Sequence, residues 1–264
     1  VNEIEAKFLE TYYFNHDLHL DCYECCDIKD LITNKKRLKD NYRNIDLVVG
    51  GPPCQGFSMA NRQRIIDDPR NRLYKDFLEL LDIVRPKYFL MENVKGMINK
   101  SDEILNDFHM ILGPDYTIDI TLLNAKDYGV PQNRERVFVV GSSNSDISSQ
   151  SIVANISKNK SSKVVIKDAL FGLPKLKPKT IKNSKSLENQ DIGFKFTKYN
   201  LKGSKFVDGL NKNPIDYLSN HINRYNNERD VEIFNTLPQG ENSLHNSIAH
   251  IMPYKNRNHI FKDK

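Results

Sequence analysis

Two kinds of hydrophobic pattern alternate along the first 141 residues of the chain. Short apolar runs rich in β-branched or aromatic residues predict buried β-strands at 45–49, 88–91 and 137–140. Apolar residues spaced three and four apart predict helices at 4–12, 74–84 and 104–112. Pro86 follows the second helix and Gly113 the third, and both are ordinary helix-ending residues. This alternation predicts an α/β fold, with a mainly parallel sheet and helices on both faces.

The pattern weakens in the second half of the chain. Residues 142–162 are rich in Ser, Asn and Lys, which predicts a long surface connection. A last compact apolar piece spans 164–173, and periodicity is weak beyond it. We therefore expect three parts: a large domain at 1–145, a connection with one last element of that domain at 146–173, and a smaller domain at 174–264.

Charge is distributed unevenly over the 264 residues. Residues 1–150 carry 19 Lys and Arg against 24 Asp and Glu, whereas residues 151–264 carry 20 against 10. A net charge of −5 followed by +10 favours a catalytic part and a part that binds a polyanion such as nucleic acid. The alternative is a solvated, lysine-rich surface.

Composition also narrows the class of protein. No apolar run reaches the roughly 18 residues of a membrane span, and no leader with a basic and then an apolar segment is visible. Three of the four cysteines, Cys22, Cys25 and Cys26, are bunched, which is no disulfide framework. No second Cys or His pair lies at a zinc-like spacing, so we expect no metal site. The lack of a long apolar run predicts no membrane partner, and the cysteine usage predicts a cytoplasmic location.

Two unusual tetrads, 52–55 and 92–95, each follow a predicted strand. In parallel sheets ligands bind outside the carboxyl ends of the strands, so both tetrads would face one crevice. Cys54 stands behind two prolines, which suits a nucleophile, and Arg134 and Arg136 would favour its thiolate. Glu92 would act as a general acid. The alternatives are an inert buried cysteine and a salt-bridged or helix-capping glutamate.

Three blocks resemble, in order and spacing, the core motifs of the cytosine-C5 DNA methyltransferases of bacterial restriction–modification systems. They are 49–58 (VGGPPCQGFS), 91–94 (MENV) and 124–137 (NAKDYGVPQNRERV). The resemblance covers roughly residues 1–141. It implies a Rossmann-like methyltransferase fold that uses S-adenosylmethionine in the bacterial cytoplasm. It also implies that 174–264 is part of a target recognition domain, whose lysines would contact the phosphates of duplex DNA.

The resemblance implies a role for each motif residue. Cys54 would attack C6 of a cytosine flipped out of the duplex, and Glu92 would hydrogen-bond N3 and donate a proton. Arg136 would hold the cytosine O2, and Arg134 would support the anionic site. Asn93 would position the loop that follows the cysteine.

Further residues are assigned by the same resemblance. The implied cofactor contacts are Glu3, Ile4, Asp27, Ile28, Pro53 and Leu73. The implied DNA contacts are Gln55 and, in a loop at 56–72 that would close over DNA, Ser58, Arg62 and Arg64. The alternatives are an exposed terminal glutamate for Glu3 and an ordinary solvated loop for 56–72.

Some motifs of the family are not found in this sequence. The opening strand with its glycine-rich turn would precede Val1, and nothing between Ile251 and Lys264 resembles the closing motifs. Because the opening strand belongs in the middle of the sheet, we expect that these residues alone do not form the complete active fold. The chain is then either a trimmed fragment or the partner of a second chain that supplies the missing motifs.

Two further functions remain open from the sequence. One is a non-catalytic DNA-binding subunit, and the other is an enzyme that methylates cytosine in RNA. The arginine-bearing loop and the long basic segment resemble the DNA enzymes, which favours DNA.

Overall fold

The computed structural model describes residues 1–16, 23–42, 44–53, 71–177, 179, 193–198, 203–210 and 217–252. The chain divides into two compact units, Val1–Val165 and Ile166–Lys264, and each is described by itself. No described helix is long and apolar enough to cross a membrane.

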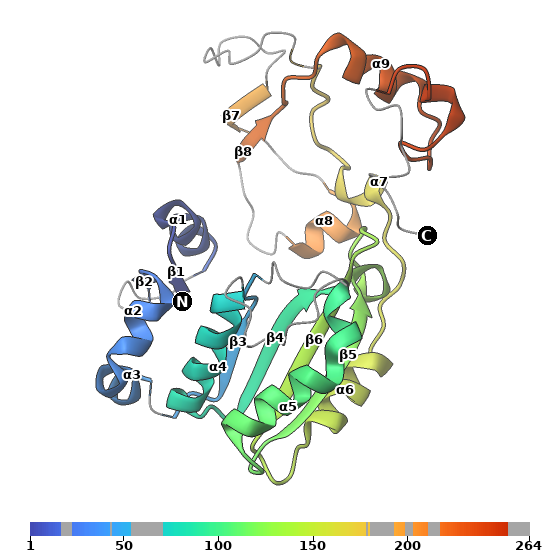
Figure 1. Cartoon of the computed structure of the whole chain (residues 1–264). Helices are drawn as coiled ribbons and strands as arrows, with labels where there is room; N and C mark the ends of the chain where they lie inside the picture. Colours follow the sequence, from blue (N-terminus) through green and yellow to red (C-terminus); the bar gives the residue numbers. More distant parts are fainter. Residues whose placement is uncertain are drawn as a thin grey trace. The chain divides into compact units, whose positions relative to one another are not determined.

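A four-stranded sheet forms the centre of the first unit (Figure 1). Its order is β3 (Leu47–Gly50), β4 (Tyr88–Val94), β6 (Glu135–Ser142) and β5 (Thr117–Asn124). The α/β fold class is confirmed, but this sheet is mixed rather than mainly parallel. β3 and β4 run parallel, whereas β6 is antiparallel to both β4 and β5. The sequence pattern did not predict β5, whose short connection to β6 allows an antiparallel pair without a crossover helix.

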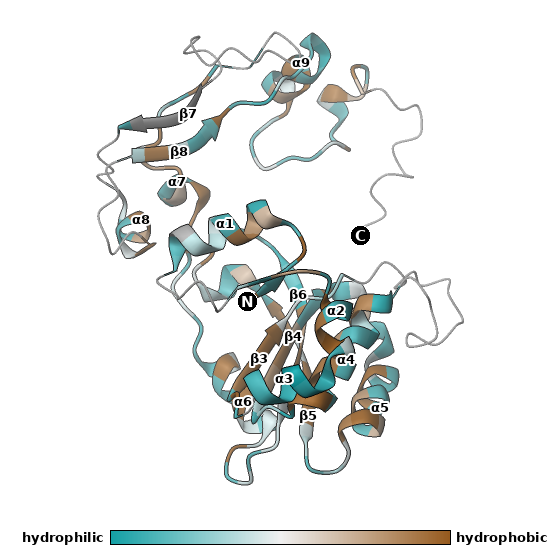
Figure 2. Cartoon of the chain, turned by 90° about the vertical axis from the view of Figure 1, so that its left-hand side faces the viewer, coloured by the Kyte–Doolittle hydropathy of each residue, from teal (hydrophilic) through white to brown (hydrophobic). Residues whose placement is uncertain are grey.

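Two helices pack on one face of this sheet, α4 (Arg72–Val84) and α5 (Ser101–Leu112) (Figure 1). Both confirm predicted helices. Phe89 of β4 stacks on Phe108 of α5, with ring centroids 5.0 Å apart, and Tyr74 of α4 meets Phe108 edge to face. The core also includes Leu78, Leu81, Met91, Met97, Ile104, Leu112, Val137 and Val139. In Figure 2 the strands of the sheet are the apolar layer, and α3 is largely hydrophilic.

The opposite face of the sheet is covered at its β5–β6 side by α6 (Ser149–Lys158). This corrects the prediction that 142–162 is a surface connection. Ser148 caps the helix by accepting from the Ser151 N–H, and the buried Ser149 hydroxyl donates to Asp119 of β5 at 2.7 Å. The one buried residue of α6 is a serine, and the segment is rich in serines overall, so its composition resembled that of a loop.

β3 is an edge strand, which corrects the prediction of a buried strand at 45–49. Its only strand partner among the described residues is β4. Leu47 is 53% exposed and Val49 is 62% exposed, whereas Val48 packs against the core. An apolar run predicts burial on both faces, but here only one face is covered.

A smaller parallel pair lies at the amino-terminal end of the chain. β1 (Asn2–Glu3) pairs with β2 (Glu24–Cys25), and α1 (Ala6–Asn15) follows β1. The helices α2 (Ile28–Thr33) and α3 (Lys35–Asn41) pack on α4 through Leu31, Ile32, Leu38 and Ile83. No described strand joins this pair to β3.

The second unit contains few buried residues in its described parts. It comprises α7 (Ile166–Ala169), β7 (Gly193–Lys198), α8 (Lys205–Leu210), β8 (Tyr217–Ile222), α9 (Glu228–Thr236) and a 3-10 turn at Asn246–Ile248. β7 and β8 are antiparallel. The Ser204 hydroxyl donates to the Asp168 carbonyl at 2.6 Å and joins α8 to α7. Val207 and Ile248 are its buried hydrophobic residues among those described.

Gly141 of β6 lies directly opposite Phe89, and a β-carbon at this position would overlap the Phe89 ring. We predict that Gly141→Ala lowers the free energy of unfolding by about 1–3 kcal/mol, because the ring must leave its stacked position. Urea unfolding measures this change. The control is Gly209→Ala in α8, where an added β-carbon meets nothing within 4 Å. Equal stability of wild type and Gly141→Ala would contradict this packing.

Candidate active site

The carboxyl ends of β3 and β4 lie side by side because the two strands are parallel. Asn93 is 4% exposed, and its side-chain amide donates to the Pro52 carbonyl at 2.9 Å. A buried amide needs such a partner, so this bond holds the backbone that follows β3. Asn93 is predicted to position the loop after Cys54, which lies outside the described residues, and its described contact is with the segment before Cys54.

Glu92 precedes Asn93 in β4 and forms an ion pair with Arg136 of β6. Glu92 Oε1 and Arg136 Nε are 2.8 Å apart, and both side chains are partly buried. The antiparallel register places Arg136 opposite Val94, which brings its side chain within reach of Glu92. A β-carbon on Gly51 would lie 3.5 Å from Glu92 Oε2. The carboxylate therefore lies beside the backbone that leads to Cys54.

Arg134 occupies a different place from Arg136. Its N–H donates to Asn124 Oδ1 at 3.2 Å and its carbonyl accepts from the Ala125 N–H at 2.9 Å, which closes the connection between β5 and β6. The residue is exposed. The structure thus brings Arg136 to Glu92 and leaves the Arg134 side chain on the surface. The predicted nucleophile Cys54 and the predicted DNA contacts Gln55, Ser58, Arg62 and Arg64 lie outside the described residues.

Four of the six predicted cofactor residues, Glu3, Ile4, Asp27 and Ile28, lie at or just after the carboxyl ends of β1 and β2. Glu3 Oε1 accepts from the N–H groups of Ile4 and Glu5 at 2.9 and 3.1 Å, and Ile4 is 62% exposed. Asp27 begins α2, and its Oδ1 accepts from the Lys29 N–H at 3.0 Å. Ile28 packs against the cluster of Leu31, Ile32, Leu38 and Ile83. Leu73, near the start of α4, is partly buried, and Pro53, which follows β3, is exposed.

An ionic cluster that sequence reasoning missed joins α2 to α4. Arg72 Nη2 lies 2.8 Å from Asp27 Oδ2, and this hydrogen bond lowers the pKa of Asp27. Arg72 Nε also lies 3.8 Å from Asp76 Oδ2, one helical turn further along α4. Asp76 is 7% exposed, and burial raises its pKa. The four-residue spacing of Arg72 and Asp76 was visible in the sequence, but the contact with Asp27 was not.

The family model described as C-5 cytosine-specific DNA methylase matches residues 1–259. The chain belongs to this family.

Curated members of the methylase family are similar to this chain over part of its length. The Type II methyltransferase M.FnuDI of Fusobacterium nucleatum is 39% identical over 145 residues, which are 53% of this chain and 39% of that protein. M.DdeI of Desulfomicrobium norvegicum is 33% identical over 220 residues, which are 81% of this chain and 50% of that protein. The chain thus spans about half the length of these relatives, or less.

A solved structure supports the same fold. A protein from an E. coli prophage, described as a "putative DNA modification methyltransferase", is 26% identical to this chain and has a TM-score of 0.54. The match covers 89% of this methylase chain and 61% of that one.

The described residues at β1 and β2 fit the nucleoside half of S-adenosylmethionine, the methyl donor that this family uses. Carboxylates such as Glu3 and Asp27 accept hydrogen bonds from the hydroxyl and amine groups of a nucleoside. The exposed Ile4 side chain offers an apolar surface to a flat base. These three residues therefore supply the groups that such a ligand needs at the ends of two neighbouring strands.

The Asn93–Pro52 hydrogen bond can be tested without any ligand. We predict that Asn93→Ala lowers stability by about 1–3 kcal/mol, because the Pro52 carbonyl loses its donor and a buried polar site is left. Amide hydrogen exchange at residues 49–53 should become faster in this variant. The control is Gln150→Ala, which removes an exposed amide from α6. If Asn93→Ala leaves both quantities at wild-type values, the bond does not hold this segment.

Proposed function

We propose that the full-length protein transfers a methyl group from S-adenosylmethionine to C5 of a cytosine flipped out of duplex DNA. The observation that carries this proposal is the Glu92–Arg136 pair beside the backbone that leads to Cys54. A carboxyl group and a guanidinium at this edge can bind the polar edge of a base, with Glu92 at N3 and Arg136 at O2.

In the proposed mechanism the thiolate of Cys54 forms a bond to C6 of the cytosine. Glu92 donates a proton to N3, so that negative charge does not build up in the ring. S-adenosylmethionine supplies the methyl group that the activated C5 accepts. Solvent water then takes the proton from C5, the Sγ–C6 bond breaks so that Cys54 departs as a thiolate, and N3 returns its proton to Glu92. Arg136 holds Glu92 and the base edge in one orientation throughout.

The other predicted residues have roles around this centre. Glu3, Ile4, Asp27, Ile28, Pro53 and Leu73 would contact the cofactor, and Gln55, Ser58, Arg62 and Arg64 would face DNA. Arg134, exposed at the surface, would support the anionic site near the DNA backbone. The basic residues of 174–264 would contact phosphates as part of a target recognition domain.

We also propose that polypeptide outside these 264 residues supplies a strand that pairs with β3 and runs parallel to it. It would come from the same gene product or from a second chain. The Asp46 carbonyl accepts from the Tyr88 N–H, so alternate residues from Asp46 face β4. The backbone groups of Leu47 and Val49 therefore face the opposite edge. Their side chains are also exposed, so a new strand would pair with the backbone and bring apolar cover.

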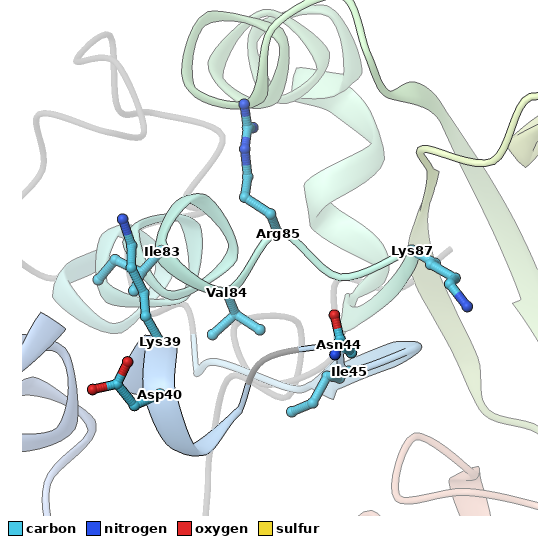
Figure 3. Close-up of a pocket in the computed structure, with 8 residues that line it drawn as sticks. All are labelled: Lys39, Asp40, Asn44, Ile45, Ile83, Val84, Arg85 and Lys87. Atoms are coloured by element: carbon cyan, nitrogen blue, oxygen red, sulfur yellow. The ribbon is translucent and has the colours of Figure 1, made fainter. Parts of the chain in front are cut away.

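A cavity at the amino end of β3 supports this proposal (Figure 3). It has a volume of about 590 Å³ and is lined by Lys39, Asp40, Asn44, Ile45, Ile83, Val84, Arg85 and Lys87. Lys87 pairs with Asp46 at 2.7 Å, and Arg85 donates to the Leu112 carbonyl at 2.7 Å. Two of the three lining cations are thus engaged with protein groups, and the apolar Ile45, Ile83 and Val84 offer cover to polypeptide that approaches β3.

The catalytic proposal is tested by transfer of labelled methyl from S-adenosylmethionine to unmethylated plasmid DNA. In the full-length protein, we predict that Cys54→Ala abolishes transfer and that Glu92→Gln slows it by about 10²–10⁴-fold, because an amide cannot donate a carboxyl proton. Cys25→Ala, at the exposed cysteine of β2, is the control that keeps activity. Transfer by Cys54→Ala would exclude this nucleophile, and preference for transfer RNA over duplex DNA would assign an RNA substrate instead.

The strand proposal is tested by amide hydrogen exchange in the isolated 264-residue chain and in the active full-length protein or complex. We predict that the amides of Leu47 and Val49 exchange at least 100-fold more slowly in the active form, because a paired strand then accepts from them. The outer-edge amides of β5, the strand at the other end of the sheet, are the control and should change little. Equal exchange of Leu47 and Val49 in both forms would show that nothing pairs with this edge.

A further inference from the structure

The Asp27–Arg72–Asp76 cluster contains one guanidinium and two carboxylates. Asp27 Oδ1 accepts from the Lys29 N–H at 3.0 Å, and Oδ2 accepts from Arg72 at 2.8 Å. A ligand donor that reaches Oδ2 shares this oxygen with Arg72 and weakens the Asp27–Arg72 hydrogen bond. The Arg72 side chain is about half exposed, which gives it room to move.

Asp76 is the second acceptor for the same guanidinium. Its Oδ2 is buried and has no hydrogen-bond partner among the described residues, although Arg72 Nε lies 3.8 Å away. A distance of 3.8 Å is too long for a hydrogen bond, and a buried carboxylate without one is costly. A shift of the guanidinium by about 1 Å towards Asp76 would satisfy this oxygen. Asp76 therefore favours the movement that frees Asp27.

We propose that Arg72 is a positioning residue that transfers from Asp27 to Asp76 when the adenine amine of S-adenosylmethionine binds Asp27. The proposal rests on the proposed function, because it takes Asp27 as an adenine contact. Without ligand, Arg72 neutralises Asp27 and joins α2 to α4. With ligand, the amine donates to Asp27 Oδ2, and Arg72 donates to Asp76 in place of its former partner. The buried acceptor thereby offsets the loss of the Asp27–Arg72 pair.

The experiment is a double-mutant cycle on cofactor binding, measured by calorimetry with S-adenosylmethionine and the full-length protein. Asp76→Asn should weaken binding by about tenfold, since Arg72 then meets a neutral acceptor instead of a charged one. In the Arg72→Ala background the same change should alter affinity by less than twofold, because no guanidinium remains to transfer. The cycle gives the coupling between Arg72 and Asp76 in cofactor affinity. A merely structural role of either residue would not produce such a coupling.

Two controls accompany the cycle. Glu79→Gln removes another carboxylate from α4, one that pairs with Lys35 at 3.0 Å, and should leave cofactor affinity unchanged. Asp76→Glu keeps the charged acceptor and should retain most of the affinity. Urea unfolding of each variant without cofactor separates loss of fold from loss of affinity.

The outcomes distinguish this proposal from the proposed function. If wild type binds the cofactor and Asp76→Asn weakens binding equally with and without Arg72, the transfer of Arg72 is wrong and the methyltransferase function stands. If wild type binds no cofactor at all, the proposed function fails and the role of Arg72 fails with it.

Discussion

The candidate active site depends on β4, which lies between β3, parallel to it, and β6, antiparallel to it. Parallel pairing with β3 brings the backbone before Cys54 to the end of β4, and antiparallel pairing with β6 brings Arg136 to the same end. Side chains alternate along the strand, so Phe89, Met91 and Asn93 enter the core while Glu92 leaves from the other face. A one-residue slip of β6 against β4 would turn Arg136 to the opposite face of the sheet and separate it from Glu92.

Asn93 links the packing of β4 to its chemistry. Its buried amide must find an acceptor, and the Pro52 carbonyl is the acceptor it has. Two prolines in the same segment restrict the backbone further, because their φ angles are fixed. The approach to Cys54 is therefore held by a hydrogen bond from the neighbouring strand and by its own residues. This rigidity suits a nucleophile that must meet one atom of a substrate.

Sequence patterns predicted those helices and strands whose hydrophobic spacing is clear within the segment itself. The helices at 72–84 and 101–112 are strongly amphipathic, and the strands that carry Glu92 and Arg136 are apolar runs. The motif blocks then indicated which strand ends face the substrate. β5 and α6 were missed because β5 mixes Thr and Asp with its apolar residues and α6 is rich in serine, with Ser149 as its buried residue.

The remaining differences concern contacts that no local pattern records. The apolar residues of β3 predict a buried strand. Its burial, however, needs a second neighbouring strand, and the described residues supply only β4. Arg72 and Asp27 are 45 positions apart, so their ion pair follows from how α2 packs on α4. Among the described residues, β1 and β2 pair only with each other, and β3 has one strand partner. Under the proposal of an added strand, pairing at the β3 edge completes the sheet.

Trapping of the covalent intermediate tests the central claim most directly. DNA copied with 5-fluorodeoxycytidine triphosphate carries fluorine where the C5 proton must leave, so the Sγ–C6 bond cannot be released after methyl transfer. Full-length protein would be incubated with this DNA and S-adenosylmethionine, digested, and examined by mass spectrometry. We predict that the DNA is attached at Cys54. Attachment at another cysteine, or methyl transfer to this DNA without a covalent adduct, would contradict the account.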